Sequence, residues 1–85
     1  MKIFYTPKFV KTYKKIPIKI RLLAVKKEKI FLANPHDPRL NTHSLTGDLD
    51  GSWSFSVNYQ YRVVFNFLEN NDILFLVIGT HDIYK

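Results

Sequence analysis

The chain has 85 residues, enough for one domain (residues 1–85) with a single modest core. It contains no cysteine, which excludes a disulfide framework and a thiolate metal site, and nothing points to an oxidising compartment. The opening run is too short for a signal peptide and no apolar run reaches membrane-spanning length, so we expect a soluble, cytoplasmic protein without membrane association.

Charge divides the chain into two unlike parts. Residues 1–34 carry ten basic side chains against Glu28 alone, a net charge of +9, whereas residues 35–85 carry a net charge of −3. A basic helical half suits a polyanion, or an acidic protein partner that covers it. The alternative is that these lysines only solvate two amphipathic helices.

The basic half predicts a strand followed by two helices. Lys2–Tyr5 has the composition of a short strand, and Thr6 before Pro7 supplies a capping hydroxyl and a residue suited to the first helical turn. We expect one helix over Pro7–Ile16 and, after the break imposed by Pro17, a second over Pro17–Ala33. The short join predicts an antiparallel hairpin. The expected core side chains are Phe9, Val10 and Tyr13 in the first helix, and Ile20, Leu23, Ala24, Ile30 and Phe31 in the second.

The second half predicts a loop and three strands. The residues from Asn34 to Pro38 end the second helix, and Gly47 and Gly51 mark a sharply turning loop anchored by leucines. The expected strands are Trp53–Asn58, Tyr61–Leu68 and Ile73–Ile78, with a turn over Glu69–Asp72 before the last. Ile73–Ile78 is apolar on both faces, which is typical of a central, covered strand.

Alternation in the first two of these strands separates an apolar face from a polar one. Trp53, Phe55 and Val57 alternate with Ser54, Ser56 and Asn58, so we expect the serines to face solvent. Arg62 falls on the less apolar face of the next strand. The predicted fold is α+β: an N-terminal strand and a two-helix antiparallel hairpin packed on a mainly antiparallel four-stranded sheet.

Four polar residues collect near that face or its rim: His43, Arg62, His81 and Tyr84. Two histidines can supply a general acid and a general base near neutral pH, and an arginine can stabilise a phosphorane. The set suits RNA transesterification, in which the ribose 2′-hydroxyl attacks its own 3′ phosphate. No cofactor or metal is expected, since Asp48 and Asp50 suit the glycine turn better than a cation site.

For three single residues, a purely structural or solvated role is the alternative to a functional one. His81 could be a surface histidine at a frayed terminus, and His36 among turn residues is interpreted as solvated. Trp53 could stack on a base, but its alternation with Phe55 and Val57 favours core packing.

An ordered set of residues runs through nearly the whole chain: Asn34, Pro35, Asp37, Pro38, Arg39 and Leu40; His43 and Leu45; Gly47, Leu49, Gly51 and Trp53; Tyr61, Arg62 and Val63; Gly79, Thr80, His81, Asp82 and Tyr84. This set resembles the RelE/ParE superfamily of toxins from bacterial type II toxin–antitoxin systems, and most of all the messenger-RNA interferases such as YoeB and YafQ. The resemblance implies a RelE-like fold and a ribosome-dependent endoribonuclease that a cognate antitoxin neutralises.

The resemblance also implies roles for individual residues. His43 matches a general base, Arg62 a phosphate-stabilising arginine, His81 a general acid and Tyr84 an aromatic that orients substrate. Relatives often have one more residue between the last two positions. Some relatives also carry charged or histidine side chains where this chain has Ser54, Ser56 and Asn58. The acid and base roles therefore depend on His43 and His81, and which is acid and which base stays open. The lysines implied in contacts with ribosomal RNA are Lys11, Lys14, Lys15, Lys26, Lys27 and Lys29.

Two alternatives share the fold. One is a ParE-like poison of DNA gyrase without nuclease activity, although such proteins generally lack the pair formed by His43 and His81. The other is an inactive module that only binds an antitoxin.

Overall fold

Thr6 joins the first strand to the first helix, as the sequence predicts. In the computed structural model of the protein, which describes residues 1–84, β1 (Ile3–Tyr5) leads into α1 (Pro7–Lys15). Thr6 Oγ1 accepts a hydrogen bond from the Phe9 amide at 3.0 Å and donates one to the Leu76 carbonyl at 2.7 Å. The cap therefore both starts α1 and fastens it to the last strand.

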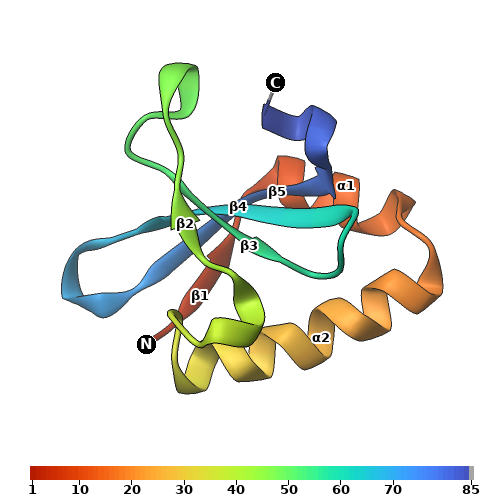
Figure 1. Ribbon diagram of the computed structural model, residues 1–85, viewed down its shortest axis with the longest axis horizontal. Coiled ribbons are helices and arrows are strands. Elements are labelled where there is room, and N and C mark those ends of the chain that lie inside the picture. The colour runs from red at the N-terminus through yellow and green to blue at the C-terminus, as the bar shows by residue number, and fades with distance from the viewer. Residues whose placement is uncertain (85) are drawn as a thin grey trace.

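A second helix and a five-stranded sheet complete the fold. The remaining elements are α2 (Ile18–Ala33), β2 (His43–Ser44), β3 (Trp53–Ser56), β4 (Tyr61–Phe67) and β5 (Ile73–Thr80). The strand order is β1-β5-β4-β3-β2, with β1 parallel to β5 and the other pairs antiparallel (Figure 1). The α+β class and its layers are confirmed. The sheet has five strands where four were expected, because the two residues of β2 are too few to produce an alternating pattern.

An aromatic core lies between the helices and one sheet face. Phe31 of α2 is fully buried, with its ring centroid 5.1 Å from that of Phe55, 4.9 Å from Phe65 and 5.6 Å from Phe75. These rings join the sheet to α2 through non-local contacts. Val10, expected in this core, is 43% exposed, because it lies at the outer edge of α1.

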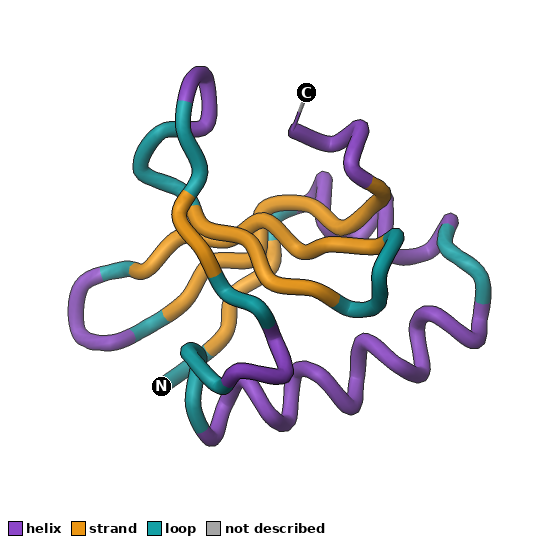
Figure 2. Tube along the Cα trace, in the orientation of Figure 1, coloured by secondary structure: helices purple, strands orange, loops and turns teal. Residues whose placement is uncertain are grey.

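A smaller cluster covers the other sheet face. Leu45, Val64 and Val77 are buried there, and Leu49 and Ile83 pack against them. They come from β4, β5, the loop with the 3-10 turn η2 (Gly47–Leu49), and the C-terminal 3-10 turn η4 (His81–Tyr84). Figure 2 shows this loop and η4 rising from the side of the sheet away from α2.

This covering layer corrects the expectation that the serine face is open to solvent. Ser54 is fully buried, and its Oγ has no hydrogen-bond partner within residues 1–84. Ser52, also buried, donates to Asn66 Oδ1 at 2.6 Å. The reason is long-range: the loop after β2 folds back over β3 and β4.

Candidate functional site

Arg62 lies on the sheet face opposite the helices. In the sheet register it stands between Ser56 of β3 and Gly79 of β5. Its Nη1 donates to the Asn58 carbonyl and, at 3.2 Å, to the Tyr61 carbonyl. The half-buried guanidinium is therefore anchored at the hairpin that joins β3 to β4.

His43 occupies the edge strand of the same sheet, directly opposite Ser54. The imidazole is exposed, and its Nδ1 lies 3.0 Å from the Asn41 carbonyl oxygen. A carbonyl can only accept, so this contact requires a hydrogen on Nδ1 and leaves the lone pair of neutral His43 on Nε2. Asn41 adopts a left-handed conformation, φ 51°, at the end of the short turn before β2.

His43 also borders a hollow at the base of the η2 loop. The hollow has a volume of about 260 Å³, and Leu45, Thr46 and Leu49 line it together with His43 and Ser44. Leu45 and Leu49 turn toward Val64 and Val77 at the base of the loop, whereas Gly47 and Asp48 are exposed.

The C-terminal turn folds back onto the sheet beside Arg62. A methyl group on Gly79 would lie less than 3.0 Å from Ile83 Cγ2, so the missing side chain of Gly79 lets η4 settle there. His81 is exposed in the first position of this turn. Tyr84 ends the turn, and its side chain lies outside the described part of the chain.

Strand order sets the separation of these groups. β4, which carries Arg62, lies between β5 and β3, and β2 with His43 lies beyond β3. Three strand spacings separate the backbones of β2 and β5, about 14 Å. The structure thus brings Arg62 and the turn with His81 together, and leaves His43 across the sheet face on the far side of Arg62.

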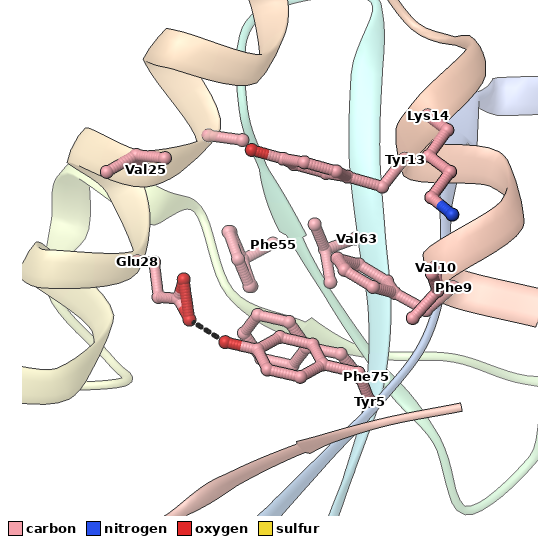
Figure 3. Close-up of a pocket in the computed structure, with 11 residues that line it drawn as sticks. Tyr5, Phe9, Val10, Tyr13, Lys14, Val25, Glu28, Phe55, Val63 and Phe75 are labelled. Carbon is pink, nitrogen blue, oxygen red and sulfur yellow. Dashed lines mark hydrogen bonds between the residues drawn. The ribbon is translucent and has the colours of Figure 1, made fainter. Parts of the chain in front are cut away.

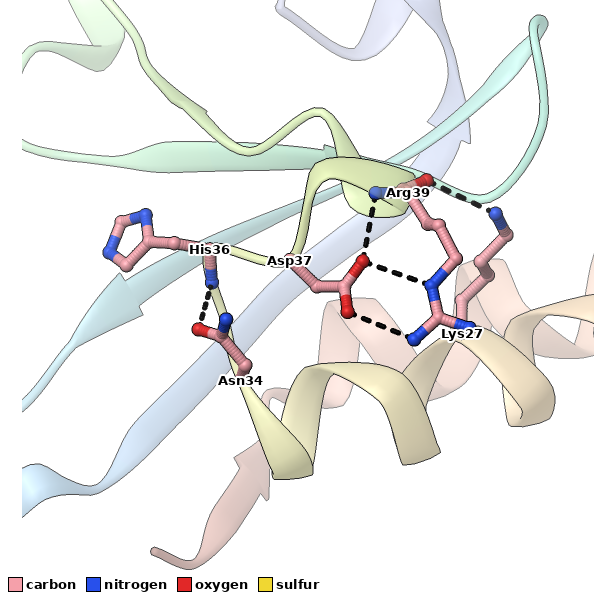
Figure 4. A network of polar contacts seen from close by, with 5 residues as sticks. All are labelled: Lys27, Asn34, His36, Asp37 and Arg39. Carbon is pink, nitrogen blue, oxygen red and sulfur yellow. Dashed lines mark hydrogen bonds and ion pairs between the residues drawn. The ribbon is translucent and has the colours of Figure 1, made fainter.

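The candidate lysines lie in the helical layer, on the other side of the sheet. Five of the six side chains are exposed: Lys11, Lys14, Lys15, Lys26 and Lys29. The first three are spaced so that they share one face of α1. Lys27 is half-buried, and its Nζ donates to the Arg39 carbonyl at 3.2 Å (Figure 4). Lys27 thereby holds the loop that precedes β2.

An ion pair in that loop is a feature that sequence reasoning missed. Asp37 accepts hydrogen bonds from the amide, Nε and Nη2 of Arg39 at 2.9, 3.0 and 2.9 Å (Figure 4). These bonds to the Arg39 side chain and amide lower the pKa of Asp37 to about 2. The pair shapes the 3-10 turn η1 (Pro38–Leu40), which directly precedes Asn41. The sequence does contain a signal for this turn, because Asp37, a typical capping residue, stands directly before Pro38.

His36 is exposed, as expected, but it is not only solvated. Its ring centroid lies 5.6 Å from that of Trp53 and 5.8 Å from that of Phe67. Trp53 also packs against the main core, in agreement with the structural interpretation of that residue.

No helix of residues 1–84 is long and apolar enough to span a membrane. No three His, Cys, Asp or Glu side chains of the described residues are grouped so that they could hold a metal ion.

Three solved structures with this architecture are distant from the chain in sequence. The YoeB/ParE toxin from Agrobacterium tumefaciens superposes with a TM-score of 0.80 at 16% identity, over 95% of this chain and 99% of that one. YafQ from Escherichia coli gives 0.76 at 20% identity, over 96% and 94% of the two chains. The RelBE2 toxin–antitoxin complex from Mycobacterium tuberculosis gives 0.77 at 17% identity, over 94% and 96%. At these identities the likeness shows the fold.

The family is shown by a match between the sequence and a family model. A search of curated protein sequences finds no match. The model of the HigB-like toxins, described as RelE-like toxins of the type II toxin–antitoxin system HigB, matches residues 4–81. The chain therefore belongs to the HigB-like family of RelE-like type II toxins.

Proposed function

We propose that this toxin is a ribosome-dependent endoribonuclease that cleaves messenger RNA in the decoding site without a metal ion. The observation that carries the proposal is the contact between His43 Nδ1 and the Asn41 carbonyl, which leaves Nε2 able to accept a proton. A histidine held in this tautomer, on the sheet face that also carries Arg62, is what base catalysis beside a phosphate requires.

The proposed reaction is an intramolecular transesterification. His43 Nε2 takes the proton of the ribose 2′-hydroxyl, and the 2′ oxygen then bonds to the adjacent phosphorus. Arg62 neutralises the extra negative charge on the phosphorane. As the bond from phosphorus to the 5′ oxygen breaks, protonated His81 gives that oxygen a proton. The products are a 2′,3′-cyclic phosphate and a free 5′-hydroxyl, and Tyr84 orients the substrate.

In-line displacement gives a reason to pair these two histidines across Arg62. The attacking and leaving oxygens stand on opposite sides of the phosphorus, so the base and the acid must approach from opposite directions. Strand β2, which carries His43, and strand β5, which leads into the turn with His81, lie on opposite sides of β4. The Nδ1 contact supports His43 as the base, which leaves His81 as the acid.

The exposed lysines of the helical layer have a separate proposed role. Lys11, Lys14, Lys15, Lys26 and Lys29 would meet ribosomal RNA phosphates while the opposite sheet face meets the message. Lys27 already has a partner in the Arg39 carbonyl, so we assign it to the fold. RelBE2 is a toxin–antitoxin complex, and we propose that a cognate antitoxin likewise neutralises this toxin in the cytoplasm.

The test is induction of wild type and His43→Ala from a tightly repressed promoter, with 5′ ends of cellular messages mapped within minutes. The matched control is His36→Ala, because His36 is also exposed but packs on Trp53, away from Arg62. We expect new ends in translated messages for wild type and His36→Ala, and at least 100-fold fewer for His43→Ala.

Other outcomes would overturn the proposal. Equal cleavage by His43→Ala would remove that residue from the reaction. Growth arrest with intact messages and damaged DNA would indicate a gyrase poison, and no arrest in any strain would leave only antitoxin binding.

A further inference from the structure

Strand β3 aligns Arg62, His43 and the η2 loop along one direction. Arg62 stands opposite Ser56 of β3. His43 stands opposite Ser54, two residues earlier and therefore on the same side of the sheet. The Leu45 amide, at the start of the η2 loop, donates at 2.9 Å to the carbonyl two residues before Ser54. Three levels thus follow one another along β3 in the order Arg62, His43 and η2 loop, each roughly 7 Å from the next.

The hollow beside His43 begins at the last of these levels. Leu45 and Leu49 form its floor, because both pack in the smaller cluster on this sheet face. The exposed residues Ser44 and Thr46 add hydroxyl groups to its border. Thr46 directly precedes η2, yet within residues 1–84 its side chain makes no capping hydrogen bond. The hollow therefore combines an apolar floor with a hydroxyl that can donate to a ligand or accept from it.

The order of the three levels matches the order of the groups in a ribonucleotide. The 3′ carbon carries the phosphate that is cleaved, the adjacent 2′ carbon carries the attacking hydroxyl, and the 1′ carbon beyond it carries the base. With the phosphate at Arg62 and the 2′-hydroxyl at His43, the base extends away from Arg62 toward the hollow. The volume of the hollow, about 260 Å³, is close to the lower limit of roughly 300 Å³ for small-molecule pockets, which suits a single base.

We propose that the hollow binds the base of the nucleotide on the 5′ side of the cleaved bond, with Thr46 as a specificity-determining residue. The face of the base packs on Leu45 and Leu49, and its polar edge meets the Thr46 hydroxyl. Only an unpaired, unstacked base can turn into the hollow, so the message must be single-stranded there. The inference rests on the proposed function, because it uses the roles assigned there to His43 and Arg62.

A second concave site, the groove between α1 and α2, is a poor alternative for this base. The groove has a volume of about 290 Å³ (Figure 3). Its lining includes Phe55 and Val63 of the main core, on the sheet face that the helices cover, whereas Arg62 lies on the opposite face. A nucleotide whose phosphate contacts Arg62 therefore cannot place its base there. Val10 borders this groove and is 43% exposed, so it offers a control position away from the message.

The first test removes the base while keeping the reacting groups. Purified ribosomes are programmed with an intact message or with one whose nucleotide 5′ of the cleaved bond is an abasic ribose that retains its 2′-hydroxyl. We expect wild type to cleave the abasic message roughly tenfold more slowly, or slower still. Equal rates would overturn the base subsite and leave the proposed function standing, whereas absence of cleavage in both messages would overturn the two together.

The variant Thr46→Phe connects that loss to the hollow. Thr46 has extended backbone angles, φ −124° and ψ 177°, which phenylalanine also adopts, so the new ring should occupy the hollow while the chain stays folded. We expect Thr46→Phe to cleave the intact message roughly tenfold more slowly than wild type, with little further loss on the abasic message. Losses that multiply would overturn the placement of the base, and thermal unfolding verifies the fold of the variant.

A matched pair of substitutions tests the role of Thr46. Thr46→Val replaces a hydroxyl by a methyl group, and Val10→Thr makes the reverse change at an exposed position of α1. Messages with each of the four bases on the 5′ side of the cleaved bond are compared. We expect Thr46→Val to change the ratio of rates between two of the bases roughly threefold or more, and Val10→Thr to keep the wild-type ratios. Unchanged ratios in Thr46→Val, or the same change in both variants, would remove Thr46 from base recognition.

Discussion

Replacing Gly79 by alanine moves the C-terminal turn while leaving the core in place. The new Cβ would lie less than 3.0 Å from Ile83 Cγ2, whereas ordinary contact begins at 3.4 Å. Ile83 Cγ2 must therefore move by at least 0.4 Å, the difference between these limits. Because this β-branched side chain has few rotamers and packs on Val64 and Val77, we expect the turn to move with it. The backbone angle of Gly79 is not left-handed, so alanine adds no conformational strain there.

The shift should affect activity much more than stability. The turn ends the described chain and can move away from the sheet, so we expect the free energy of unfolding to change by less than about 1 kcal/mol. Displacement of a catalytic group by about 1 Å can cost roughly 100-fold in rate. We therefore expect Gly79→Ala to cleave messages on programmed ribosomes about 10- to 100-fold more slowly.

A second substitution tests whether the close approach of the new Cβ to Ile83 Cγ2 causes the loss of activity. Ile83→Ala removes Cγ2, so the double variant Gly79→Ala/Ile83→Ala should regain part of the activity that Gly79→Ala loses. Cleavage rate and thermal unfolding are measured for both single variants and the double one. Full activity in Gly79→Ala, or additive losses in the double variant, would refute the placement of the turn over Gly79.

Three further predictions concern the fold. Phe31→Ala should lower the free energy of unfolding by about 3–5 kcal/mol in urea titrations, whereas Phe4→Ala, at a 47% exposed ring, should cost less than about 1 kcal/mol. Burial, and then the bond to Glu28, raises the pKa of Tyr5, so the folded chain keeps this phenol protonated above the unfolded value of 10.0. Stability should therefore fall as pH rises above 10.0, and less steeply in Tyr5→Phe, which thermal melts at pH 8–11 can compare. The pKa of Asp37 is about 2 against an ordinary 3.8, so the ionised carboxylate stabilises the fold fully above pH 3.8 and loses this effect as pH falls toward 2. Thermal melts should therefore show a fall in Tm over this pH range that is absent from Asp37→Asn. An equal fall in Tm in both proteins would contradict the role of the ion pair.

The parts of the fold that were predictable are those set by neighbours in sequence. Thr6 and Pro7 specify a helix start by themselves, and Pro17 specifies the break between the helices. Alternation assigned Val63 and Phe65 to the helix-packed face, and the structure buries both.

What the sequence could not predict depends on segments that meet across the fold. Alternation says which face Ser54 occupies, but only the return of the η2 loop decides that this face is covered. The charge of Lys27 predicts a solvent-exposed side chain, whereas its ammonium group donates to the carbonyl of Arg39 in η1. The four candidate residues could be chosen from their chemistry, but the contact that fixes the His43 tautomer requires the left-handed turn at Asn41.

The central claim is that the 2′-hydroxyl of the message is the nucleophile on the ribosome. The most direct test programs purified ribosomes with two messages that differ only by a single 2′-deoxy nucleotide in the decoding site. The account predicts cleavage of the all-ribose message to a 2′,3′-cyclic phosphate and no cleavage at the deoxy position. Equal cleavage of both messages, or arrest of translation with both left intact, would contradict it.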